Sequence, residues 1–178
     1  MVFKLNRGAY VPLVLAGSIA GAGLKLFAPI PNIELLLPFI MAAGMLSGGA
    51  RGFAAGFSIR MMYDFYLGIP GPWTLYTALA YGIVGFLASY ISLGASRKQL
   101  VVWGALFTVL YDVITMLGYG LSFGLPLALL IVPQVPFTIL HLTGNCVFVF
   151  AVLPILLNFE TVFSSKAPKI RVLARLPE

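Results

Sequence analysis

The residues best suited to ligand binding or catalysis are polar side chains that recur at helical spacing within strongly apolar sequence. One set, spaced i, i+3, i+4, i+7 and i+11, consists of Thr108, Tyr111, Asp112, Thr115 and Tyr119. A second set, spaced i, i+4, i+7 and i+11, consists of Gln134, Thr138, His141 and Asn145. Each set shares one face of a helix. Carboxylate, imidazole and amide groups on two such faces could hold a polar ligand or transfer a proton.

Further candidates lie close to the expected ends of helices, and they are Asn32, Glu34, Trp73 and Tyr76. The two aromatic rings could stack on a flat heterocyclic ligand. They could also be ordinary aromatic residues of a membrane interface, as could Tyr119. Glu34 could contribute to binding, or it could pair with Lys25 as a clasp across the loop.

Charged and polar groups inside an apolar helix also have structural explanations. A charge near the middle of a bilayer costs about 2.5–3.5 kcal/mol on insertion scales, so it should be paired or face a cavity. Arg60 and Asp64 are four residues apart and could neutralise each other on one helix. Asp112 has no partner in its own helix and is a stronger site candidate, although it could cap a helix or pair with Arg60. His141 and Asn145 could instead join two helices by hydrogen bonds.

The composition places these helices in a membrane. Of the 178 residues, 61% are hydrophobic and 9% are charged, and the mean hydropathy is +1.03. Soluble proteins are about a quarter charged, so a soluble domain is excluded. The single cysteine, Cys146, excludes an intramolecular disulfide and a thiolate metal cluster, and we expect no metal or other cofactor. The formal net charge of +6 forms no basic patch, so we expect no nucleic-acid partner.

Turns rich in proline and glycine divide the chain into apolar segments. The predicted spans cover about residues 10–27, 33–47, 52–67, 73–93, 99–119 and 136–157. Prolines interrupt residues 120–136, which predicts a partly helical lid or a re-entrant segment there. We therefore predict one domain over residues 1–178, an all-α integral membrane protein. It is a compact bundle of six transmembrane helices with polar ends at about 1–9 and 158–178.

The basic residues predict how the bundle lies in the membrane. Six spans place both termini on one side, and the basic residues on that side are Lys4, Arg7, Arg51, Arg97, Lys98, Lys166, Lys169, Arg171 and Arg175. Only Lys25 falls on the other side, so the positive-inside rule makes the N- and C-termini cytoplasmic. The polar candidates then share the outer half of the bilayer and face one cavity that opens outward.

Small residues in the first span form two pairs on adjacent faces, Ala16 with Ala20 and Gly17 with Gly21. Such pairs let another helix approach closely, either from within the bundle or from a partner protein.

Taken in order, these features resemble the substrate-binding S components of energy-coupling factor (ECF) vitamin transporters. The resemblance covers almost the whole chain. It rests on Ala16 and Ala20 and on the segments 31–34 (PNIE), 71–74 (GPWT), 80–85 (AYGIVG) and 136–145 (PFTILHLTGN). The first outer loop and the turn before Trp73 are most similar to S components for cobalamin-type or unassigned substrates.

The resemblance implies a subunit of an ATP-driven importer in a prokaryotic plasma membrane that binds a vitamin or related micronutrient at the outer face. Where the family binds its ligand, this chain has the candidates Asn32, Glu34, Trp73, Tyr76, Asp112, Tyr119, His141 and Asn145. A transmembrane scaffold, the T subunit, would contact Ala16 and Ala20, and two cytoplasmic ATPases would supply the energy. The chain itself has no GxxxxGK[ST] phosphate-binding motif.

Two other functions stay open at the level of sequence. Asp112 and His141 could act as base and orienting group of an intramembrane enzyme, although no G-x-S-x-G or HExxH motif accompanies them. Alternatively, the polar residues could only join helices in a structural or assembly protein of a membrane complex.

Overall fold

The computed structural model describes residues 7–29 and 33–158, with side chains from Tyr10 onward. Within these residues the chain forms six α-helices and no strand, which confirms the all-α class. The helices are α1 (Arg7–Phe27), α2 (Leu37–Ser47), α3 (Gly49–Tyr66), α4 (Pro72–Ala88), α5 (Arg97–Phe123) and α6 (Leu127–Ala151). Most of the predicted polar ends, at 1–9 and 158–178, lies outside the described residues.

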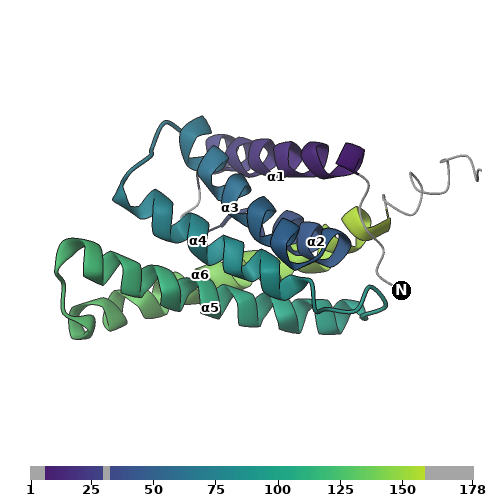
Figure 1. Cartoon of the computed structure of the whole chain (residues 1–178). Coiled ribbons are helices and arrows are strands. Elements are labelled where there is room, and N and C mark those ends of the chain that lie inside the picture. Colours follow the sequence, from purple (N-terminus) through teal and green to yellow (C-terminus); the bar gives the residue numbers. More distant parts are fainter. Residues whose placement is uncertain (1–6, 30–32, 159–178) are drawn as a thin grey trace, which may run out of the picture.

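Successive helices run in opposite directions, so both ends of the described chain lie at the same end of the molecule (Figure 1). Three helices, α1, α5 and α6 with its extension to Asn158, are long and apolar enough to cross a membrane. By contrast, α2 has 11 residues, which rise about 16 Å and cover about half of a hydrocarbon core. The long helices are therefore combined with shorter ones.

Several helix boundaries differ from those predicted, and for α2 and α4 the cause is local. α2 begins at Leu37 rather than at residue 33, because Pro38 is best accommodated in the first turn of a helix. α4 ends at Ala88 rather than near Leu93. The residues that follow Ala88 make backbone hydrogen bonds to carbonyls three residues back, which tighten the chain into a turn.

The predicted lid or re-entrant segment at 120–136 is wrong. α5 continues to Phe123, and Gly124, with φ of 64°, closes it in the left-handed conformation that glycine adopts without strain. α6 begins after a three-residue turn and runs through Pro133 and Pro136. A proline removes one helical hydrogen bond, and membrane helices tolerate that loss where neighbouring groups or local backbone adjustments satisfy the freed carbonyl. α5 and α6 thus form a continuous antiparallel hairpin.

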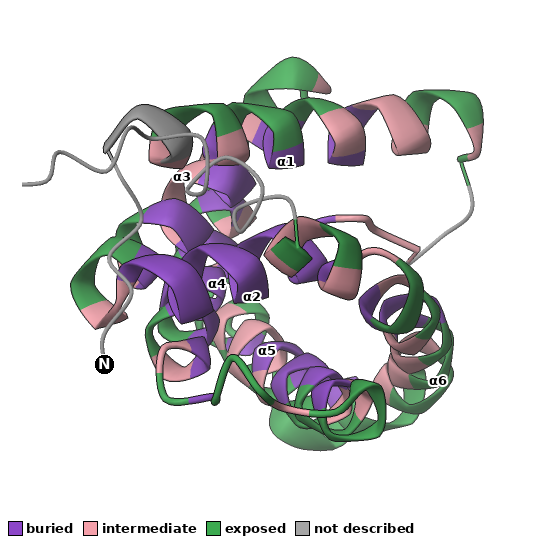
Figure 2. Cartoon of the chain, turned by 90° about the vertical axis from the view of Figure 1, so that its right-hand side faces the viewer, coloured by how far each residue is buried: buried purple, intermediate pink, exposed green. Residues whose placement is uncertain are grey.

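The core is built by α2, α3 and α4, and all 11 residues of α2 are buried (Figure 2). Glycines bring these three backbones into contact. A Cβ atom at Gly56 would lie 2.0 Å from the Tyr81 carbonyl oxygen, and one at Gly85 would lie 2.1 Å from the Gly52 carbonyl oxygen. One at Gly44 would lie 2.2 Å from the Gly85 carbonyl oxygen. We call α2, α3 and α4 the glycine-packed core, because any larger residue at these positions would force the helices apart.

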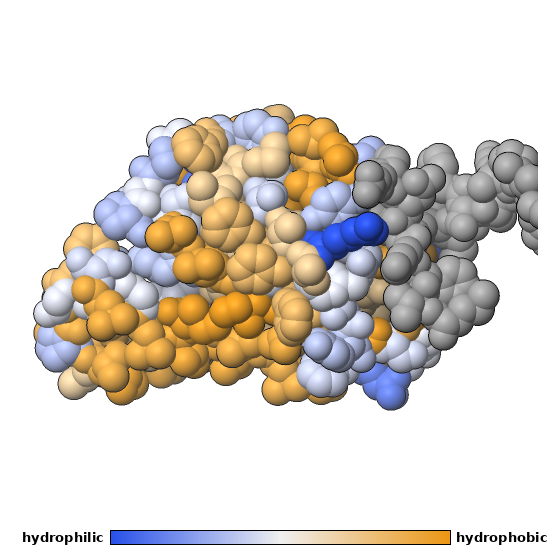
Figure 3. Space-filling model, viewed as in Figure 1, coloured by the Kyte–Doolittle hydropathy of each residue, from blue (hydrophilic) through white to orange (hydrophobic). Residues whose placement is uncertain are grey.

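The outward faces of the long helices are apolar. On α5 the exposed large apolar residues recur every three or four positions, and they include Val102, Leu106, Val109, Val113 and Leu117. Figure 3 shows apolar side chains along this side of the molecule. A continuous apolar surface of this kind suits contact with lipid.

Candidate functional site

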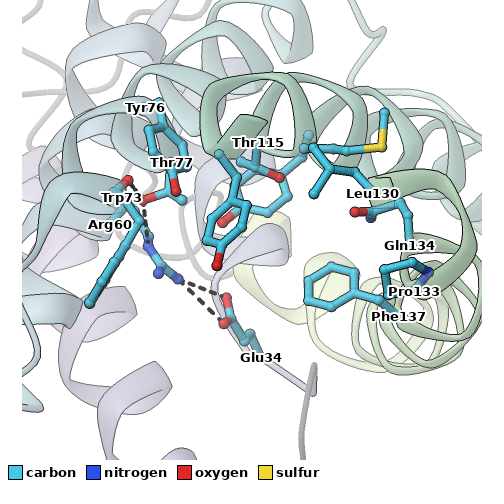
Figure 4. A pocket seen from close by; sticks show the side chains of 13 residues that line it. Glu34, Arg60, Trp73, Tyr76, Thr77, Thr115, Leu130, Pro133, Gln134 and Phe137 are labelled. Carbon is cyan, nitrogen blue, oxygen red and sulfur yellow. Dashed lines mark hydrogen bonds and ion pairs between the residues drawn. The ribbon is translucent and has the colours of Figure 1, made fainter. Parts of the chain in front are cut away.

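A cavity of about 400 Å³ lies between helix ends (Figure 4). The helix ends that line it are at the end of the bundle opposite the ends of the described chain (Figure 1). Its walls come from α3, α4, α5, α6 and the segment before α2. The lining residues are Glu34, Arg60, Trp73, Tyr76, Thr77, Tyr111, Thr115, Met116, Tyr119, Leu130, Pro133, Gln134 and Phe137. This volume suits a small organic molecule, because pockets for such ligands measure about 300–1,000 Å³.

Arg60 of α3 is the charged centre of one wall, and it is buried among hydrogen-bond acceptors. Its Nη2 lies 2.9 Å from Asp64 Oδ1, and its Nη1 lies 3.2 Å from Glu34 Oε2. Its Nε donates to Thr77 Oγ1 at 3.2 Å (Figure 4). The pair within α3 that the sequence allowed is therefore present, and Glu34 extends it to the segment before α2.

The turn between α3 and α4 positions the aromatic residues of the same wall. The Gly71 N–H donates to Thr74 Oγ1 at 3.0 Å, and the Thr74 hydroxyl donates to Asp64 Oδ2 at 2.7 Å. The first turn of α4 is thus tied to the Arg60 cluster, and Trp73 and Tyr76 extend from it into the lining of the cavity. The ion pairs and the aromatic wall form one connected unit.

Aromatic rings from α4 and α5 meet at close range beside this cluster. Tyr111 stacks on Tyr81, with ring centroids 4.1 Å apart. A Cβ atom at Gly118 would lie 2.6 Å from Cγ of Tyr76, so glycine is what lets that ring lie against α5. Tyr119 follows in the last turns of α5 and is 43% exposed. Tyr76, Tyr111 and Tyr119 all line the cavity, and aromatic rings in such a lining can pack against a flat ligand.

Opposite these rings, α6 contributes a mostly apolar wall of Leu130, Pro133 and Phe137 (Figure 4). Gln134 is its polar member, and its Nε2 donates to Thr138 Oγ1 at 3.0 Å. A cavity with one charged and aromatic wall and one apolar wall can orient a ligand that has both a polar and an apolar side.

Asp112 and His141 form a buried pair behind the cavity. Asp112 Oδ1 lies 2.7 Å from His141 Nδ1, and each side chain is 2% exposed. Tyr111 and Phe137, which do line the cavity, pack edge-on against the imidazole, with centroid separations of 5.4 and 5.7 Å. The pair thus supports lining residues and does not itself form the surface of the cavity.

Asn145 lies in the same buried layer and joins α6 to α5. Its Nδ2 donates to Thr108 Oγ1 at 2.9 Å. Asp112 Oδ2, His141 Nε2 and Asn145 Oδ1 have no hydrogen-bond partner within the described part of the chain. The two polar faces predicted from the sequence do meet. Their contacts are interhelical hydrogen bonds, which are the structural alternative to a binding role for His141 and Asn145.

The predicted binding residues fall into three groups. Glu34, Trp73, Tyr76 and Tyr119 line the cavity together. Asp112, His141 and Asn145 lie one layer behind the lining. Asn32 lies outside the described residues.

Several lining residues were not among the binding residues predicted from sequence. Arg60 was left open between site and structure, and Tyr111, Thr115 and Gln134 belonged to the polar faces without being assigned to the site. Thr77 could have been predicted as a lining residue, because it lies one helical turn after Trp73. Met116, Leu130, Pro133 and Phe137 carried none, because they are apolar residues in apolar sequence.

The two small-residue pairs of α1 lie in different surroundings. A Cβ atom at Gly17 would lie 2.8 Å from Phe39 Cβ, and one at Gly21 would lie 2.2 Å from Leu36 Cδ2, so this pair packs within the bundle. Ala16 is exposed, and Ala20 is partly buried against the core. Of the two, Ala16 is the one that another protein could contact directly.

Among residues 7–29 and 33–158, no three His, Cys, Asp or Glu side chains come together as metal ligands would. No family model, no curated protein and no solved structure matches this chain. Its function is therefore argued from the geometry of the cavity.

Proposed function

We propose that this chain is the substrate-binding S component of an ECF-type importer in a prokaryotic plasma membrane. It captures a vitamin or related micronutrient, and its partners carry out the ATP-driven delivery. The observation that carries this proposal is the cavity of about 400 Å³, whose aromatic rings surround a buried ion-pair cluster. Buried charges are costly in a membrane protein, and they commonly mark the path of a ligand.

The direction of capture follows from the position of the cavity and the distribution of basic residues. With six spans and cytoplasmic termini, the end of the bundle away from the chain ends faces outward. A ligand bound there becomes accessible inside only if the outward and inward states bind it differently. The T subunit and the two ATPases supply that change, and Ala16 and Ala20 are the proposed contact with the T subunit.

An intramembrane enzyme is the rival that one specific observation favours, namely the 2.7 Å contact between Asp112 and His141. A general base must reach the proton that it removes. Tyr111 and Phe137 stand between this pair and the cavity, so the pair suits the support of lining residues better than catalysis. A purely structural role leaves the cavity without an explanation.

Native mass spectrometry of the purified chain in detergent is the direct test. We expect one small molecule bound at unit stoichiometry, and its mass then identifies the cargo. A chain that is always empty, and that no vitamin stabilises against thermal unfolding, contradicts the proposal.

A matched pair of variants on α5 locates the bound molecule. Thr115 lines the cavity, whereas Val113 lies on the outward face of the same helix and is 44% exposed. Thr115→Trp fills the cavity and is expected to abolish binding, whereas Val113→Trp adds the same bulk toward lipid and leaves binding intact. Both proteins are measured by native mass spectrometry after their melting temperatures have been compared. Equal binding by the two variants would place the ligand elsewhere.

A further inference from the structure

We propose that the ligand of this cavity is a small organic cation with a flat aromatic or heteroaromatic part. The inference rests on the proposed binding function and narrows it to one class of substrate. It follows from the charges gathered at the cavity, from the hydrogen bonds that Arg60 already makes, and from the aromatic lining.

The ionisable groups at the cavity carry an excess of negative charge. The whole chain has five acidic residues, and three of them, Glu34, Asp64 and Asp112, lie at the cavity or directly behind it. They face one guanidinium, Arg60, and one imidazole, His141. Three carboxyl groups therefore outnumber the single guanidinium at this site.

Arg60 is not available to an incoming anion. Its three nitrogen atoms already contact Asp64, Glu34 and Thr77 at 2.9–3.2 Å. A carboxylate or phosphate ligand would have to displace a carboxylate from Arg60 and leave that group unpaired, which is strongly unfavourable in a buried site. Glu34, whose two carboxylate oxygens both accept from Arg60 Nη1, is the more exposed of the paired charges, so its carboxylate is the charged group most open to a ligand.

Apart from Arg60, no basic residue of the described helices lines the cavity. Arg51, near the start of α3, and Arg97 and Lys98, at the start of α5, lie at the opposite end of the bundle. Lys25 lies in the last turn of α1 and does not line the cavity. The end opposite the cavity is therefore basic, whereas at the cavity's end three carboxyl groups outnumber the two basic side chains with a fixed charge, Arg60 and Lys25.

The aromatic lining completes a site for a cation. Trp73, Tyr76, Tyr111, Tyr119 and Phe137 supply five rings to one cavity. The face of an aromatic ring attracts a cation, and Trp and Tyr do so more strongly than Phe. Away from water, the attraction between such a cation and Glu34 is also strengthened. A charged ring system that stacks on these faces satisfies both kinds of group.

The test compares three ligands of one shape and different charge. The probes are 1-methylnicotinamide, a cation, nicotinamide, which is neutral, and nicotinate, an anion. The protein is the full chain in detergent with Trp103→Phe, so that Trp73 is the only tryptophan, and binding is followed as saturable quenching of its fluorescence. We expect the cation to bind at least about tenfold more tightly than either of the other two.

Two substitutions of opposite sign show whether charge decides this preference. Glu34→Gln keeps side-chain atoms beside Arg60 but removes a negative charge, and it should lower the affinity for the cation about tenfold. Gln134→Glu adds a carboxylate to the opposite wall and should raise that affinity. Lys98→Gln, at the far end of the bundle, should change nothing.

The outcomes separate this inference from the proposed function. Equal or tighter binding of nicotinate, or a cation affinity that neither substitution changes, overturns the cation assignment while leaving a binding subunit. A co-purified anion or neutral molecule in native mass spectrometry does the same, and a co-purified cation supports the assignment. Absence of any bound ligand, together with no saturable quenching by any probe, overturns both.

Discussion

The glycine-packed core and the α5–α6 hairpin are held together by opposite means. In the core, backbones touch directly, and a Cβ atom at Gly56 would lie 2.0 Å from the Tyr81 carbonyl oxygen. In the hairpin, side chains bridge the helices, as Asp112 does with His141 at 2.7 Å and Asn145 with Thr108 at 2.9 Å. Close backbone contact leaves no space, whereas helices separated by large side chains can leave a cavity at their ends.

This difference explains where the cavity forms. Tyr111 of the hairpin stacks on Tyr81 of the core at 4.1 Å and thereby spaces α5 from α4. The cavity lies between that aromatic contact and α6. The core is therefore the rigid wall, and the hairpin is the wall whose position depends on side chains. Substitutions should therefore be least tolerated in the glycine-packed core. In the α5–α6 hairpin, a second substitution should compensate more readily for the first.

The largest expected effect is the loss of the core contact through Gly56→Leu. Leucine cannot fit where a Cβ atom would already lie 2.0 Å from a backbone carbonyl, so α3 and α4 must separate. We expect a loss of about 4 kcal/mol or more in unfolding free energy, at the upper end for overpacking. Gly23→Leu is the matched control, since nothing lies within 4 Å of a Cβ atom at Gly23.

Denaturant titration of both glycine variants in detergent measures this difference. Gly23→Leu should unfold at or above the wild-type midpoint, because leucine is the better helix former. If Gly56→Leu unfolds at the same midpoint as its control, direct contact between α3 and α4 is not what holds the core.

The sequence predicted the hairpin better than it predicted the core. A polar residue within apolar sequence is conspicuous, and helical spacing alone places Asp112 and His141 on faces that should meet. The contact between Gly52 and Gly85 depends on the register of two helices, which no local pattern contains. Glycine is also common in membrane helices, so the glycines in close contact could not be distinguished from Gly23, where an added Cβ atom would meet no described atom within 4 Å.

The errors at the cavity have physical causes as well. Pro133 and Pro136 were expected to delay the start of the last span to about residue 136, but α6 runs through both prolines, as membrane helices can where other groups satisfy the freed backbone atoms. That error concealed the first turns of α6, from which Leu130 and Gln134 line the cavity. Depth along the membrane placed His141 near the site correctly. Depth alone could not show that Phe137 stands in front of it.

An intermediate effect is expected from the pair that joins the hairpin. His141→Leu leaves the Asp112 carboxylate buried without its partner, which should cost about 3–5 kcal/mol. The double substitution Asp112→Leu with His141→Leu removes both polar groups and should cost less than the single change, because two apolar side chains can pack together. Unfolding free energies of both single variants and the double variant complete the cycle.

The same cycle also distinguishes support from direct contact with the ligand. If the pair only supports Tyr111 and Phe137, the double variant should recover much of the binding that His141→Leu loses. Binding that is lost in all three variants, while stability recovers in the double variant, would place Asp112 or His141 in contact with the ligand itself.

The smallest effect on stability is expected on α1, where two neighbouring residues meet the two kinds of surroundings. Ala16 is exposed, whereas a Cβ atom at Gly17 would lie 2.8 Å from Phe39 Cβ. Ala16→Leu should change the unfolding free energy by no more than about 0.5 kcal/mol, as is usual for surface changes, whereas Gly17→Leu should destabilise the chain strongly.

Ligand binding by the isolated Ala16→Leu protein should stay intact. Uptake by cells that also carry the T subunit and the ATPases should fall sharply, because leucine at position 16 obstructs a close helix contact. Normal uptake by a stable Ala16→Leu protein would remove this face of α1 from the partner interface.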